Sequence, residues 1–67
     1  MTSRQVELLK REIETARELA AMYDKTGRVF LAAGNRAKAY ERRDLAAMEY
    51  RKAELLTRQL QASGVKL

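Results

Sequence analysis

Arginine and tyrosine side chains supply the chemistry that this sequence can offer, and they gather in one stretch. Between residues 28 and 43 the acid Glu41 and the ring of Tyr40 stand among five bases: Arg28, Arg36, Lys38, Arg42 and Arg43. Guanidinium groups and amphipathic rings are enriched at binding hot spots because they give much contact for little lost freedom. The predicted partner-binding residues are therefore Arg36, Tyr40, Arg42 and Arg43. An ordinary solvated basic face would have the same composition.

Catalysis is not expected from this set of residues. The chain has no histidine and no cysteine, so imidazole bases, thiolate nucleophiles and the commonest metal ligands are missing. The remaining polar residues are mostly Arg, Lys and Glu at helix-surface spacing, without a nucleophile paired to a base. The sequence predicts a protein that is not an enzyme and that uses no metal or cofactor.

Composition predicts one small helical domain. The 67 residues include no proline, three glycines and only four aromatic residues, which is too few for a β-sandwich core. A chain this short buries only about 60% of its unfolded surface, so oligomerisation is expected. The first residues, MTSRQVELLKREIE, contain no long apolar run, so we expect neither a secretory signal nor a membrane span, and a cytoplasmic location.

A first helix is predicted over residues 3–24. Thr2 and Gln5 have the spacing of a capping box, in which each side chain satisfies a free backbone amide of the other. One apolar stripe follows at alternating steps of three and four: Val6, Leu9, Ile13, Ala16, Ala20 and Tyr23. A second apolar shoulder consists of Leu8, Leu19 and Met22. That shoulder either widens the core or forms a second contact surface.

The stretch YDKTGRV predicts a turn at residues 24–27. Asp24 and Thr26 can cap helices there, and Gly27 can adopt the left-handed conformation that closes a helix. A longer second helix is then expected over 28–62, followed by a short tail at 63–67. The predicted fold is an all-α antiparallel hairpin that dimerises into a helical bundle. Gly34 is interpreted as a helix-interior residue that, with Ala33 and Ala37, lets the two helices approach closely.

The apolar positions of the second helix change sides along its length. Phe30, Ala33, Ala37 and Tyr40 share one line, which predicts that the Tyr40 ring packs inside the hairpin with its hydroxyl at the rim. Leu45, Ala46, Ala53, Leu56 and Leu60 lie roughly 120° further round. A break at Arg43 and Asp44 would give three helices, but a continuous helix is favoured because YERRDLA has no turn residue.

The longer second helix would extend about 13 residues, roughly 20 Å, beyond the first. A second copy of the chain is the simplest cover for that extension, so we expect a homodimer. The residues expected in the core or dimer contact are Leu8, Leu9, Ile13, Leu19, Met22, Phe30, Ala37, Leu56 and Leu60.

Taken as a whole, the run RQVELLKREIETARELAAMYDKTGRVFLAAGNRAKAYERRDLAAMEYRKAELLTRQLQ resembles the very small proteins of Pseudomonas-infecting phages that act as quorum-sensing anti-activators. The resemblance implies a helical-hairpin homodimer that binds the DNA-binding domain of a LuxR-type regulator and keeps it off DNA. It also implies inhibition of the ATPase that assembles type IV pili. Two other functions remain open: a small helical co-chaperone or secretion adaptor that holds a client helix, and a minor DNA-binding protein that uses the net charge of +5.

Overall fold

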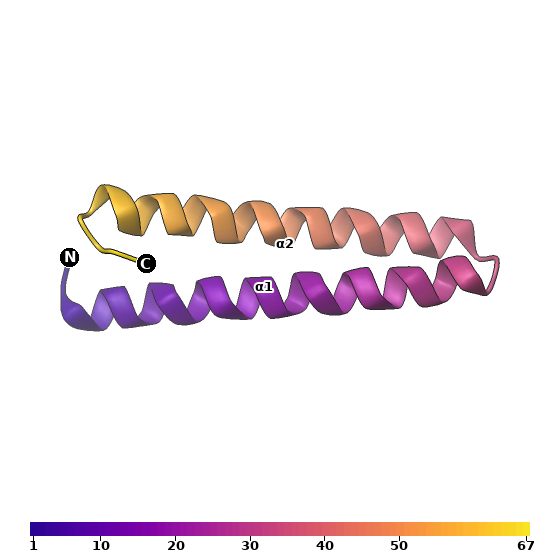
Figure 1. Ribbon diagram of the computed structural model, residues 1–67, viewed down its shortest axis with the longest axis horizontal. Helices are drawn as coiled ribbons and strands as arrows, with labels where there is room; N and C mark the ends of the chain where they lie inside the picture. The colour runs from indigo at the N-terminus through magenta and orange to yellow at the C-terminus, as the bar shows by residue number, and fades with distance from the viewer.

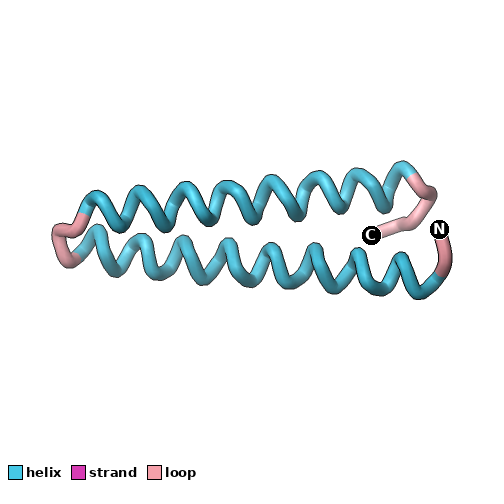
Figure 2. Tube along the Cα trace, turned by 180° about the vertical axis from the view of Figure 1, so that it is seen from behind, coloured by secondary structure: helices cyan, strands magenta, loops and turns pink.

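The computed structural model describes all residues, 1–67, as two antiparallel helices (Figure 1). Helix α1 spans Ser3–Ala32 and helix α2 spans Arg36–Ala62, with no strand. The helices lie side by side along a molecule 47 Å long, 15 Å wide and 13 Å thick. Both termini lie at one end, and loops occur only at the two ends of the hairpin (Figure 2). The predicted all-α hairpin is confirmed, and neither helix is long and apolar enough to cross a membrane.

Local side-chain chemistry starts both helices. The capping box predicted at Thr2 and Gln5 is present, with both reciprocal hydrogen bonds formed. Asn35 caps α2, since its side-chain oxygen accepts from the amide of Lys38 at 3.2 Å. Between the helices Gly34 has a φ of 81°, the left-handed conformation that closes a helix without strain only at glycine. The turn therefore comprises residues 33–35.

The turn predicted at 24–27 is wrong, because α1 continues through it. The Thr26 hydroxyl donates to the carbonyl of Tyr23 within the helix instead of capping a new one. Gly27 is buried against α2, where a Cβ would lie 3.4 Å from both the Ala39 carbonyl oxygen and the Arg42 Cβ. Gly27 is therefore an interior residue of α1, and its conformational freedom is not used at a turn.

Moving the turn to 33–35 also changes the helix lengths. Helix α1 has 30 residues and α2 has 27, so the predicted longer second helix is wrong and the uncovered extension does not exist. Helix α2 begins at Arg36 instead of residue 28. It runs unbroken through Arg42, Arg43 and Asp44, as predicted.

The helices meet along a seam of positions spaced alternately by three and four residues, the pattern of a coiled-coil pair. On α1 every seam position is buried or half-buried, which agrees with the predicted stripe: Val6, Leu9, Ile13, Ala16, Ala20, Tyr23, Gly27 and Phe30. The same holds on α2 for Ala39, Arg42, Ala46, Glu49, Ala53, Leu56 and Leu60. The apolar centre lies toward the termini and consists of Ile13, Ala16, Ala53 and Leu60.

The predicted change of side along the second helix is not real. The seam of α2 is one continuous line, but Arg42 and Glu49 occupy two of its positions, so hydrophobicity alone does not show it. Ala33 lies in the turn and Ala37 is exposed, so the predicted small-residue contact at these positions is wrong. The alanines that allow close approach are Ala39, Ala46 and Ala53.

The residues predicted for the core or dimer contact divide into three groups. Ile13 and Leu60 are buried, and the half-buried members are Leu9, Leu19, Phe30 and Leu56. Leu8, Met22 and Ala37 are exposed in the single hairpin. Tyr40, for which core packing was predicted, is 56% exposed, because the real seam passes through its neighbour Ala39.

Candidate protein-interaction site

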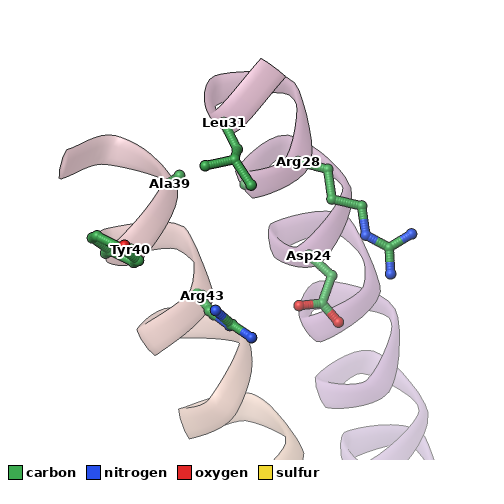
Figure 3. A pocket seen from close by; sticks show the side chains of 7 residues that line it. Asp24, Arg28, Leu31, Ala39, Tyr40 and Arg43 are labelled. Atoms are coloured by element: carbon green, nitrogen blue, oxygen red, sulfur yellow. The ribbon is translucent and has the colours of Figure 1, made fainter. Parts of the chain in front are cut away.

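A depression of about 300 Å³ opens between the helices near the turn (Figure 3). Helix α1 contributes Asp24, Gly27, Arg28 and Leu31, and α2 contributes Ala39, Tyr40 and Arg43. We call this depression the basic pocket. It contains two of the predicted partner-binding residues, Tyr40 and Arg43, together with Arg28 from the other helix.

Small residues in the seam create the basic pocket. Gly27 and Ala39 face each other at its floor, where neither has a side chain long enough to fill the space. On α1 the residues Asp24, Arg28 and Leu31 recur at steps of four and three, so they line one side of the helix. In Figure 3 Arg43 and Asp24 point into the space between the helices, whereas Arg28 extends outward from the rim.

The pocket retains unneutralised positive charge. The structure has one ion pair, between Arg58 and Glu54 at 2.6 Å, so neither Arg28 nor Arg43 has a carboxylate oxygen within 4.0 Å. The acid Asp24 also lines the pocket, and its Oδ2 atom accepts a 3.2 Å hydrogen bond from the Tyr50 hydroxyl. The pocket therefore has two bases against one acid, and neither guanidinium group forms an ion pair within the chain.

The Tyr50–Asp24 hydrogen bond also affects proton binding at the rim of the pocket. The pKa of Tyr50 lies above its ordinary value of 10.0, first because packing partly removes water from the hydroxyl. The hydrogen bond to Asp24 and the charge of its carboxylate raise the pKa further, and the charge of Arg28 partly offsets the rise. Tyr50 is therefore a neutral donor at pH 7, and it holds the Asp24 carboxylate.

The structure separates the predicted partner-binding residues. Arg36 is exposed at the first position of α2 but does not line the pocket. Arg42 occupies the seam, half-buried, with its guanidinium carbon 5.9 Å from the ring centroids of both Tyr23 and Phe30. Such cation–π contacts are worth about 0.5–1 kcal/mol at exposed sites and more when water is excluded. We therefore assign Arg42 a packing role.

Sequence reasoning missed Arg28 as a site residue. Arg28 lies in the same basic stretch of the sequence as Arg43, which could have indicated its role. The turn predicted at 24–27, however, put both residues on one helix. Only the turn at 33–35 places Arg28 on the opposite helix from Arg43, where both line the same pocket.

No group of three or more side chains from His, Cys, Asp and Glu is placed to hold a metal ion. Comparisons with models of protein families, with curated proteins and with solved structures find no match to this chain.

Proposed function

We propose that this chain is a non-enzymatic binding protein whose basic pocket captures an acidic segment of a partner protein. The observation that carries the proposal is that Arg28 and Arg43, from opposite helices, both line the pocket and neither forms an ion pair within the chain. A guanidinium group binds a carboxylate through two parallel hydrogen bonds, which gives both strength and orientation. Leu31 and the exposed ring of Tyr40 add apolar contact beside the charges.

The proposed partner is a host protein, and the mode of action is occlusion. The resemblance to phage anti-activators supports the DNA-binding domain of a LuxR-type regulator as the target, which the bound hairpin would keep off DNA. The ATPase that assembles type IV pili is the second proposed target. Both targets place the protein in the cytoplasm of the host cell, and we propose that it acts there as a homodimer.

The net charge of +5 favours a second candidate, binding to nucleic-acid phosphates. Lysine and arginine side chains that neutralise phosphates release counterions, so such binding weakens steeply as salt concentration rises. No residue is singled out by this second candidate, because any exposed base would contribute. That difference separates the two functions experimentally.

The test compares two double variants of equal charge change. Arg28→Glu with Arg43→Glu reverses the charge of the pocket, and Arg11→Glu with Arg51→Glu reverses two exposed bases outside it. Binding to a purified LuxR-type DNA-binding domain is measured by calorimetry, with circular dichroism as the check on folding. We expect the pocket variant to bind at least tenfold more weakly, about 1.4 kcal/mol, and the control variant to bind as the parent does.

Equal binding by parent and pocket variant would place the partner site elsewhere. If the parent instead binds random-sequence DNA with a steep salt dependence, and both variants lose that binding equally, the nucleic-acid function replaces the one proposed.

A further inference from the structure

The broad face of the hairpin away from the basic pocket carries apolar side chains from both helices. On α1 they belong to a line of positions that runs beside the seam with alternating steps of four and three residues. The line passes through positions 8, 12, 15, 19, 22, 26 and 29. A matching line on α2 passes through 38, 41, 45, 48, 52, 55 and 59. We call the large aliphatic members the apolar face: Leu8, Leu19, Met22, Leu45, Met48 and Leu55.

Contacts place the two lines on the same side of the molecule. Leu8 and Glu12 of α1 line one depression together with Gln59 of α2, so these flanks adjoin. The opposite flanks adjoin at the basic pocket and at the hydrogen bond between Asp24 and Tyr50. Figures 1 and 2 view the hairpin onto its two broad faces in turn.

The single hairpin leaves this apolar face uncovered and has little core of its own. Of the seven buried hydrophobic residues, Ile13 and Leu60 are the only ones larger than alanine. Four members of the apolar face are about half exposed or more, with Met48 the most open at 66%. Monomeric proteins rarely expose contiguous apolar patches above a few hundred Å², so a protein surface is expected to cover this one.

Charge indicates which protein surface covers it. On the two lines the bases Lys38 and Lys52 balance the acids Glu12 and Glu41, and in the seam Arg42 balances Glu49. The whole net charge of +5 therefore lies on the rest of the surface. Two apolar faces can meet without net repulsion, whereas two basic faces cannot. The occupant that fits is a second copy of this chain.

The size of the face agrees with that occupant. The whole broad face, polar positions included, is 47 Å long and 15 Å wide, roughly 700 Å², close to the ~800 Å² that each partner contributes to a standard stable interface. A face that pairs with itself about a two-fold axis makes a closed dimer, which is the commonest symmetry among soluble oligomers.

The seam also holds one unsatisfied polar atom. The Oε2 atom of Glu49 is buried and has no hydrogen-bond partner, a costly state for a carboxylate oxygen. Helical spacing puts Glu49 beside Leu45 and Lys52, at the edge of the apolar face.

We infer that two hairpins pair through their apolar faces into a four-helix assembly whose basic pockets point outward on opposite sides. This inference goes beyond the binding of a host protein and identifies the surface through which the proposed homodimer forms. Its consequence is a bivalent molecule. The two pockets could engage two acidic segments at once, which raises the effective affinity for a dimeric partner.

The first test measures oligomeric state without any host protein, so its failure is distinct from failure of the proposed partner. Sedimentation velocity should give the parent twice the 7.7 kDa chain mass at tens of micromolar. Met48→Glu should raise the dimer dissociation constant at least 100-fold, whereas Leu31→Glu, 54% exposed at the basic pocket, should leave it unchanged. A monomeric parent at millimolar concentration would overturn the inference and leave the apolar face to another protein, as in a co-chaperone or adaptor.

A second test reads the face directly and does not depend on the glutamate variants folding. Because the chain has no cysteine, Met48→Cys and Ala47→Cys each introduce one thiol, the first on the apolar face and the second on the flank of α2 that carries Tyr40 and Arg43. Alkylation of the cysteine at 48 should slow at least tenfold between 1 μM and 1 mM protein, while the rate at 47 stays constant. Protection at 47 and not at 48 would contradict the proposed arrangement.

Discussion

Leu60 is the only large side chain that the hairpin buries completely, with 0% of its surface exposed. It packs with Ile13 and Ala53 where the half-buried Leu9 and Val65 close the open end of the hairpin. Leu60→Ala removes three carbon groups, worth about 2.4 kcal/mol at ~0.8 kcal/mol per buried group, before any cavity cost. Because Val65 belongs to the tail and can move inward, the added cavity cost should be small. We expect the free energy of unfolding to fall by about 2–3 kcal/mol.

Such a loss is large for this chain. At 0.05–0.15 kcal/mol per residue, a domain of this size has roughly 3–10 kcal/mol of stability in total. The melting temperature should therefore fall by roughly 10–20 °C, at 4–8 °C per kcal/mol. Urea unfolding followed by circular dichroism at fixed protein concentration measures the change in free energy.

Leu31→Ala is the matched control for Leu60→Ala, because the same atoms are removed from a side chain that is 54% exposed. It should change stability by no more than about 0.5 kcal/mol. If the two variants lose equal stability, or if Leu60→Ala loses less than about 1 kcal/mol, Leu60 is not the anchor of this end and the packing argument fails.

Two further predictions use the two glycines and the hydrogen bond at the rim of the pocket. Gly34→Ala should lower the free energy of unfolding by about 1 kcal/mol, because φ is 81° there. Gly27→Ala should not lower it, since helix propensity gains ~1 kcal/mol and the atoms nearest to the new Cβ lie at 3.4 Å. Urea titrations that rank the two variants in the opposite order would refute this assignment of the turn. Asp24→Asn should lower the pKa of Tyr50, because the carboxylate that disfavours the phenolate is removed. Ultraviolet titration in a Tyr23→Phe, Tyr40→Phe background checks the shift, and an unchanged value would mean that Asp24 does not act on Tyr50.

The sequence by itself determined the helical class, the start of α1 and the continuity of α2. Spacing of Thr2 and Gln5 specified the cap, and the alternating steps from Val6 to Tyr23 specified the buried stripe of α1. The absence of turn residues around Arg43 and Asp44 specified an unbroken second helix. Each of these features depends on residues within a few positions of one another, so local chemistry is sufficient to predict them.

Tertiary structure alone decided which glycine makes the turn and therefore which residues form the pocket. Gly27 and Gly34 each have neighbours that can cap a helix, so local chemistry does not choose between them. A turn at 24–27 would leave about 13 residues of the second helix without a partner. A turn at 33–35 gives helices of 30 and 27 residues, so the seam positions of each helix are covered by the other. Burial along the full length of both helices selects Gly34, and that choice puts Arg28 and Arg43 on opposite sides of one pocket.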